Sequence, residues 1–199
     1  MNKNISEIIN AAIEKELPDL VFKNAKIIDV FSLEVIYGDI AVLDDMIIGI
    51  GKYHNAKKVI DLKGKFVSPG LIEAHVHIES SLIIPENFST VLLKHGITTA
   101  VIDPHEIANV MGIDGIRYMI DSTEHTELDI FVMLPSCVPS TPYESSGAVL
   151  RAADLKNFYS HPRVLGLGEL MNYPGLLDSD ADLLQKILDA KSFNLSVDG

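Results

Sequence analysis

The pattern of hydrophobic and polar positions divides the chain into three stretches. The first, residues 1–19, places apolar side chains at helical spacing and reaches Pro18, which stops a helix. The apolar positions of this stretch are Ile5, Ile8, Ile9, Ala12, Ile13 and Leu17. The spacing predicts an amino-terminal helix over residues 5–17 that covers a neighbouring sheet and carries no chemistry.

The second stretch, residues 20–67, consists of short runs rich in β-branched residues. The runs are 20–22, 25–30, 39–43, 46–50 and 58–62. Asp44 and Asp45 separate the third run from the fourth and predict a hairpin turn. We expect a small β-rich, sandwich-like domain segment here, and we find no residues in it that suggest chemistry.

The third stretch, residues 68–199, alternates apolar strands with helices. The predicted strands are 71–78, 97–103, 129–134, 164–169 and 193–198, and the predicted helices are 85–95, 112–124, 152–159 and 181–190. This α/β alternation is typical of a parallel sheet covered by helices, and it fits both a barrel and an open sheet. The stretch holds four complete βα units and the start of a fifth, against eight in a (β/α)8 barrel. We therefore expect the first half of such a barrel, cut at its fifth strand.

Composition narrows the classes of function. The net charge is −12, from 16 basic and 28 acidic residues, and no basic run occurs, which disfavours nucleic acid and fits a small neutral or cationic substrate. Cys137 is the only cysteine, so no disulfide forms within the chain and a reducing, cytoplasmic setting is favoured. The sequence shows neither a signal peptide nor a membrane span.

The most informative chemical feature is the pair His75 and His77. Side chains alternate faces along a strand, so both imidazoles project from the same side. Two such histidines can hold one divalent cation, with Zn, Mn or Fe as suitable ions. The alternative is a pair of half-buried histidines with hydrogen-bond partners. The preceding turn at Pro69 and Gly70 and the polar residues 79–81 beyond the pair favour a metal site at a strand end.

A second candidate ligand is Glu169, which ends an otherwise uncharged strand. Gly166 and Gly168 precede it and allow other groups to approach the strand closely. A carboxylate in such a place is costly unless it is paired or bound to a metal. An ion pair with a helix-end Lys or Arg is the alternative, but the combination with His75 and His77 favours ligation of Mn, Fe or Zn.

Three further strand ends carry weaker signals. Residues 103–106 fit a site role and a solvated helix start equally well. Ser80 and Ser81 fit ordinary loop hydroxyls slightly better than a site. Cys137 is better explained as a small core residue than as a nucleophile, because the sequence offers it no evident base.

The run from Ser68 to His77, together with the β-rich stretch before it, resembles the amidohydrolase superfamily of metal-dependent hydrolases. Four further segments in order resemble the bacterial adenine deaminases within it. These segments are 77–81, 103–110, 135–139 and 166–175. The resemblance runs from about Leu20 to the last residue.

This resemblance implies a β-rich domain beside a (β/α)8 barrel with a binuclear metal centre. It assigns His75 and His77 as ligands and Glu169 as the bridging carboxylate, where many relatives carry a carboxylated lysine. The remaining ligands of the family follow from the fifth, sixth and eighth strands, and Asp198 with Gly199 resembles the lead-in to the first of them. We therefore expect residues 1–199 alone to be inactive.

The implied reaction is hydrolytic deamination of adenine to hypoxanthine and ammonia by a metal-activated hydroxide, a step of purine salvage. The implied cofactors are two divalent metal ions, Mn or Fe in preference to Zn. Glu169, His105 and Glu106 are the candidate catalytic residues, and Ser80, Ser81 and Asp103 are the candidate substrate-binding residues. The full-length protein is expected to be a homo-oligomer.

Two other functions compete with this one. A related amidohydrolase could act on an amide, as a deacetylase or a cyclic amide hydrolase. A truncated, catalytically silent chain could instead serve as an interaction module. Residues 79–81 and 103–106 argue against the first alternative through the resemblance alone.

Overall fold

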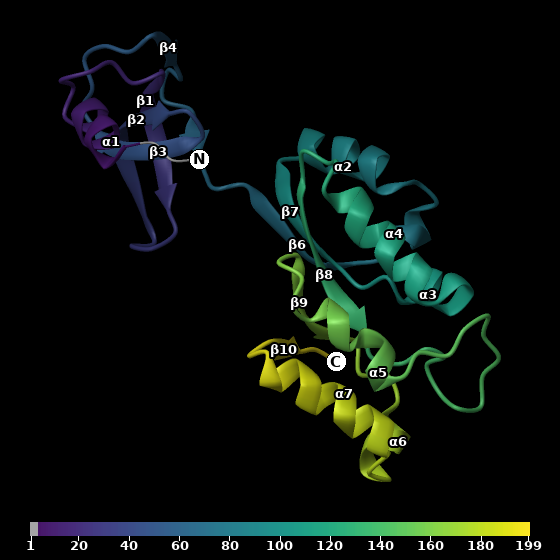
Figure 1. The fold of residues 1–199 in the computed structure, drawn as a ribbon. Helices are drawn as coiled ribbons and strands as arrows, with labels where there is room; N and C mark the ends of the chain where they lie inside the picture. The colour runs from purple at the N-terminus through teal and green to yellow at the C-terminus, as the bar shows by residue number, and fades with distance from the viewer. Residues whose placement is uncertain (1–3) are drawn as a thin grey trace. The chain divides into compact units, whose positions relative to one another are not determined.

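A computed structural model describes residues 4–199, which form two compact units divided between Pro69 and Gly70 (Figure 1). Each unit is described by itself. Residues 1–3 of the predicted amino-terminal stretch lie outside the described part. No helix among residues 4–199 is long and apolar enough to cross a membrane.

The first unit begins with helix α1, Ile5–Ala12, which is shorter than the predicted helix over 5–17. Asn4 caps its start by accepting a hydrogen bond from the backbone N–H of Ser6. The helix ends early because Glu14 adopts a left-handed backbone conformation (φ 56°) and its carboxylate turns to the loop at His54. The extended periodicity up to Leu17 was therefore misleading.

The sheet of the first unit has the strand order β3-β2-β1-β4, with β5 also paired to β1. Its strands are β1 Leu20–Asp29, β2 Glu34–Leu43, β3 Met46–Gly51, β4 Lys58–Asp61 and β5 Phe66–Val67. The predicted runs 20–22 and 25–30 are one strand, because a register shift between Phe22 and Ala25 interrupts its pairing without ending it. The predicted hairpin at Asp44 and Asp45 is confirmed, since Leu43 pairs with Met46 across it.

The second unit is a parallel sheet of strand order β10-β9-β8-β7-β6. Its strands are β6 Leu71–Val76, β7 Ile97–Ile102, β8 Asp129–Pro135, β9 Val164–Gly168 and β10 Ser196–Val197. Its α-helices are α2 Pro85–Lys94, α3 His105–Met111, α4 Ile113–Thr123, α5 Ala152–Leu155, α6 Tyr173–Leu177 and α7 Ala181–Ser192. Short 3-10 turns occupy Glu79–Ser81 and Lys156–Phe158. The predicted alternation of strand and helix is confirmed, and neighbouring strands follow one another in sequence, as in a (β/α)8 barrel (Figure 1).

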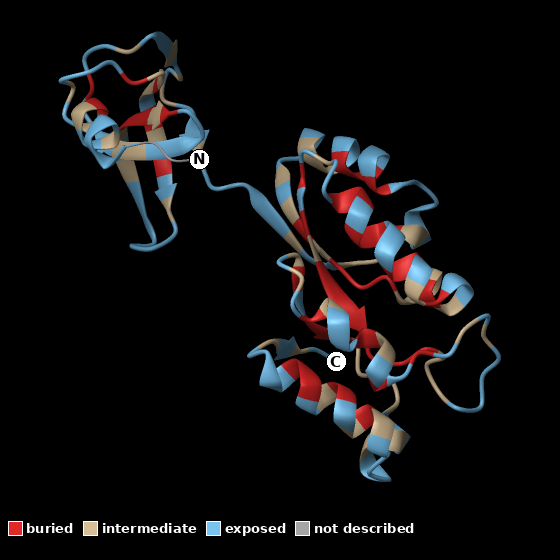
Figure 2. Ribbon diagram, viewed as in Figure 1, coloured by how far each residue is buried: buried red, intermediate tan, exposed pale blue. Residues whose placement is uncertain are grey.

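The core of this unit lies between the strands and the helices that follow them. Ile102, Ile130 and Leu134 from the strands are fully buried together with Ile116 and Met119 of α4. Figure 2 shows the buried positions of α4 and α7 along one side of each helix. This core fixes the direction of the strands, so their carboxyl ends are held at one edge of the sheet.

Strand β6 is not the buried strand that its sequence predicts. Leu71 and Ile72 are 59% and 65% exposed. The reason is position, because β6 is the last strand in the order and pairs only with β7 within the described residues. Ile78, just beyond the strand, is buried.

Candidate metal centre

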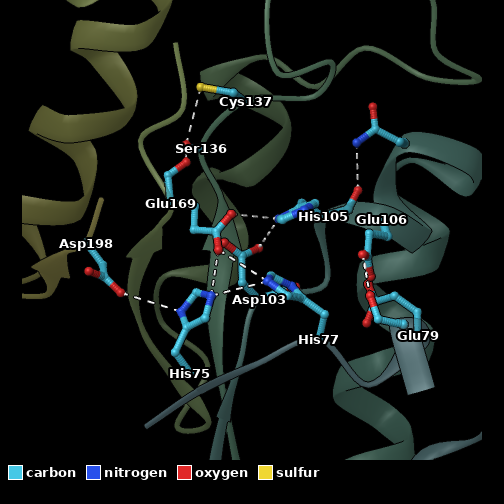
Figure 3. A network of polar contacts seen from close by, with 12 residues as sticks. His75, His77, Glu79, Asp103, His105, Glu106, Ser136, Cys137, Glu169 and Asp198 are labelled. Atoms are coloured by element: carbon cyan, nitrogen blue, oxygen red, sulfur yellow. Dashed lines mark hydrogen bonds and ion pairs between the residues drawn. The ribbon is translucent and has the colours of Figure 1, made fainter. Parts of the chain in front are cut away.

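The polar side chains singled out at strand ends come together at one edge of the parallel sheet (Figure 3). His75 and His77 lie at and just beyond the end of β6, and Asp103 follows β7 directly. His105 opens α3, and Glu169 follows β9 directly. The segment 103–106, which the sequence left open, leads into helix α3 and also places two of its side chains, Asp103 and His105, in this cluster.

Three of these side chains lie within ligand-sharing distance of one another. Oε1 of Glu169 is 2.6 Å from Nε2 of His75 and 3.2 Å from Nε2 of His77. The two Nε2 atoms are 3.2 Å apart. His75, His77 and Glu169 therefore present three ligand atoms to a common point, an arrangement able to hold a divalent cation.

The ring of His77 is oriented by the backbone of the next strand. Its Nδ1 lies 2.8 Å from the carbonyl oxygen of Asp103, so the Nδ1–H donates to that oxygen. Nε2 then carries the free lone pair and faces Glu169. Such a hydrogen bond behind a ligating nitrogen is the usual way in which proteins fix the tautomer of a metal-binding histidine.

Asp103, His105 and Glu169 form a second group on the other side of Glu169. Nδ1 of His105 is 3.5 Å from Oδ1 of Asp103 and 3.5 Å from Oε2 of Glu169. Each carboxylate oxygen of Glu169 thus faces a different group. A carboxylate shared between two groups of potential ligands is able to bridge two cations.

The second group contains buried polar atoms that have no hydrogen-bond partner among residues 4–199. These atoms are both carboxylate oxygens of Asp103 and Nδ1 of His105. Burial raises the pKa of Asp103, and the Asp103 carboxylate in turn holds the pKa of His105 above its usual value. Buried polar groups normally have partners. A cation among these atoms would supply the missing one, so the residues fit a divalent metal.

The backbone at Glu169 is held in an unusual conformation, with φ 25°. The Ser136 hydroxyl and the backbone N–H of Met171 both donate to its carbonyl oxygen, and the N–H of Leu170 donates to the carbonyl oxygen of Asp198. A positive φ in a residue other than glycine persists only where its surroundings enforce it. These bonds fix the direction in which the Glu169 carboxylate leaves the strand.

The glycines before Glu169 permit the close approach that the sequence predicts. A Cβ on Gly168 would lie 2.6 Å from Oδ2 of Asp103, and one on Gly166 would lie 2.2 Å from the carbonyl oxygen of Ser196. Both distances are shorter than any real contact. Because Gly168 has no side chain, the buried Asp103 carboxylate fits beside β9.

The remaining predicted site residues lie beside the cluster rather than in it. Ser80 donates from its hydroxyl to Glu106, and Ser81 donates to the carbonyl oxygen of Ile78. One carboxylate oxygen of Glu106 and one of Glu79 are buried and have no partner within the described part of the chain. Cys137 is buried, as expected of a small core residue.

Two residues near the centre were missed. Asp198 lies 3.8 Å from Nδ1 of His75, measured from its Oδ2. Lys186 reaches the end of β8 from helix α7. Its signal was present, because a lysine stands among the apolar positions of an amphipathic helix.

A parallel sheet whose consecutive strand ends carry histidines and carboxylates is typical of barrel hydrolases that use divalent metal ions. The chain belongs to the amidohydrolase family, whose model matches residues 66–199. It is 52% identical over 195 residues to the adenine deaminase of Clostridium acetobutylicum, covering 98% of this chain and 34% of that protein. It is 47% identical over 200 residues to the adenine deaminase of Bacillus subtilis (strain 168), covering 100% of this chain and 34% of that protein. The chain thus spans about a third of the length of the curated relatives it matches.

Solved structures establish the fold. An N-acyl-D-glutamate deacylase from Bordetella bronchiseptica, complexed with zinc and a phosphonate inhibitor, matches with a TM-score of 0.62 and 18% identity, over 92% of this chain and 44% of that one. An atrazine chlorohydrolase from Arthrobacter aurescens TC1, complexed with zinc, matches with a TM-score of 0.61 and 15% identity, over 89% of this chain and 52% of that one. The predicted α/β class with part of a (β/α)8 barrel is confirmed.

Proposed function

We propose that this protein hydrolyses adenine to hypoxanthine and ammonia at a centre of two divalent metal ions. The observation that carries the proposal is the position of Glu169, whose two carboxylate oxygens face two separate ligand groups. Its support from comparison is the 46–52% identity to adenine deaminases across nearly the whole chain.

His75, His77 and Glu169 are the proposed ligands of one ion. Asp103, which the sequence suggested as a substrate contact, has no exposed side-chain surface and belongs to the second group. We therefore assign Asp103 and His105 to the second ion, together with Glu169. Imidazole and carboxylate ligands suit Mn and Fe, which we favour over Zn. A divalent ion in such a site supplies a water that is ionised near neutral pH.

The chain's own groups must also move protons. Deamination requires that a ring nitrogen of the purine gain a proton and that the amino group leave as ammonia. We assign this role to Glu106, which accepts a hydrogen bond from the exposed Ser80 hydroxyl and keeps its other carboxylate oxygen without a partner among the described residues. Ser80 is the proposed substrate contact. Ser81 is the weaker candidate, since its hydroxyl is already bound to the Ile78 carbonyl.

The test uses the complete protein loaded with Mn²⁺ and supplied with adenine. We expect hypoxanthine and ammonia in equal amounts, measured by chromatography and an ammonia assay. His77→Ala should lower turnover by several orders of magnitude, because it removes a ligand of the ion that activates water. His95→Ala is the matched control, since His95 is an exposed residue at the end of α2, and should leave turnover unchanged.

Two results would contradict the proposal. Hydrolysis of an amide substrate without release of ammonia from adenine would move the protein to the deacetylase or cyclic amide hydrolase class. Full turnover by the His77→Ala protein would show that the reaction does not need the proposed metal centre.

A further inference from the structure

Lys186 is a buried lysine on the strand-facing side of helix α7, with 4% of its surface exposed. Its ammonium group lies 2.9 Å from the carbonyl oxygen of Ser136 and 2.8 Å from that of Leu150. Oδ2 of Asp182 is 3.4 Å away. Burying a charged ammonium is strongly unfavourable unless it is paired and hydrogen-bonded. Here the ammonium group donates to two carbonyl oxygens and is paired with one carboxylate.

Ser136, the first of these acceptors, directly follows strand β8 and contacts β9 through its other groups. Its backbone N–H donates to the carbonyl oxygen of Gly168 at 3.3 Å. Its hydroxyl donates to the carbonyl oxygen of Glu169 (Figure 3). The same residue therefore binds Lys186 on one side and the backbone of Glu169 on the other.

Glu169 depends on such support. Its φ of 25° is unfavourable for a residue with a Cβ, and a small rotation there would swing the carboxylate away from His75 and His77. The Ser136 hydroxyl is the side-chain group that binds the Glu169 carbonyl among the described residues. Whatever fixes Ser136 also fixes the direction of the Glu169 carboxylate.

We propose that Lys186 is a positioning residue for the metal centre, acting through Ser136 on Glu169. The ammonium group anchors the Ser136 carbonyl, and the anchored hydroxyl holds Glu169 in the conformation that aims its carboxylate at both ligand groups. This inference rests on the metal centre of the proposed function and is independent of adenine as the substrate.

The test measures Mn²⁺ affinity in the metal-free form of the complete protein, with free Mn²⁺ followed by electron paramagnetic resonance. Lys186→Met keeps the length and removes the charge, and Ser136→Ala removes only the hydroxyl. Each should weaken Mn²⁺ binding about 10- to 100-fold, the usual effect of removing a group behind a ligand. Lys191→Met, on the exposed part of the same helix, is the control and should bind Mn²⁺ like the unaltered protein.

The double variant separates positioning from simple packing. If Lys186 acts through Ser136, Lys186→Met combined with Ser136→Ala should weaken Mn²⁺ binding no more than the stronger single change does. Fully multiplicative losses would overturn the proposal. So would a lower unfolding temperature for Lys186→Met with unchanged Mn²⁺ affinity, which is the result expected of a structural lysine.

Three outcomes remain. If Lys186→Met does not fold, Ser136→Ala alone decides, and unchanged Mn²⁺ affinity in that variant overturns the proposal. If the unaltered protein binds no Mn²⁺, the centre fails and this inference with it. If the unaltered protein binds Mn²⁺ and the variants match it, this inference alone fails.

Discussion

Glu14 shows how one partly buried carboxylate can organise a loop that is distant in sequence. It accepts hydrogen bonds from the backbone N–H groups of His54 and Asn55, at 2.6 and 3.2 Å, and lies 2.8 Å from Nδ1 of the His54 ring. These bonds, with the His54 ring the largest contributor, lower the pKa of Glu14 to about 2.

This lowered pKa links the stability of the first unit to pH. A carboxylate whose pKa is lower in the folded protein stabilises it fully above the pKa of the unfolded chain, here 4.5, and less as pH falls toward 2. We expect Glu14→Gln to lower the unfolding temperature above pH 4.5 and to differ less from the unaltered protein at lower pH. Calorimetry at several pH values from about 3 to 7 would measure this difference in unfolding temperature.

The control for this prediction is Glu34→Gln, which removes the same charge from an exposed position in β2. It should leave the unfolding temperature nearly unchanged. A Glu14→Gln protein as stable as the unaltered one at neutral pH would show that the contacts with the loop contribute nothing.

At the same scale, sequence alone predicted part of the centre. The proximity of His75 and His77 follows from strand alternation, and the isolation of Glu169 at a strand end follows from its apolar neighbours. The place of Asp103 could not be predicted, because its burial depends on the absence of a side chain at Gly168, about 65 residues later. The burial of Lys186 was indicated by its place among the apolar positions of α7, but its partners could not be predicted, because two of them are carbonyl groups, which every residue carries.

At the scale of elements, strand β9 depends on glycine positions at which no side chain fits. A Cβ at Gly168 would meet Oδ2 of Asp103 at 2.6 Å and Cβ of Met133 at 2.7 Å. Neither neighbour can retreat easily, because Asp103 is fully buried and Met133 is in the adjacent strand. The strand therefore accepts no side chain at this point without displacing the second ligand group.

We expect Gly168→Ala to destabilise the protein by about 1–3 kcal/mol, the usual effect of overpacking, and to weaken Mn²⁺ binding at the same time. Thermal unfolding and Mn²⁺ titration of the complete protein would measure the two effects. Gly51→Ala is the matched control, because a Cβ there would meet no described atom within 4 Å. Normal Mn²⁺ affinity in the Gly168→Ala protein would show that Asp103 does not contribute to metal binding.

The order of the elements was readable from the sequence, but their ends and their burial were less so. Alternating apolar strands and amphipathic helices mark a parallel α/β sheet whatever its partners. The early end of α1 depends on the conformation of Glu14, and the exposure of β6 depends on its place at the edge of the sheet. Both are tertiary properties that local pattern does not encode.

At the scale of the whole chain, β6 presents an unpaired edge within the described residues. Leu71 and Ile72 there are 59% and 65% exposed. Edges of this kind pair with other chains. We expect residues 1–199, produced alone, to self-associate with rising concentration, as measured by light scattering after gel filtration.

A charge on the edge tests the cause of that association. Ile72→Lys should reduce it, because edge lysines oppose strand pairing. Val110→Lys changes an equally exposed apolar residue on α3 and should leave association as it was. A chain that stays monomeric at all concentrations would show that the edge of β6 does not cause self-association.

Because these side chains follow successive strands, the ribosome synthesises them one after another over a measurable interval. Glu169 follows His75 by roughly 90 residues. A ribosome adding ~5–20 residues per second therefore delivers it about 5 to 20 seconds after the histidines. During that interval the nascent chain carries His75 and His77, and later Asp103 and His105, but not the carboxylate that both groups share. An ion that binds before Glu169 is made therefore binds without that shared carboxylate and can still dissociate.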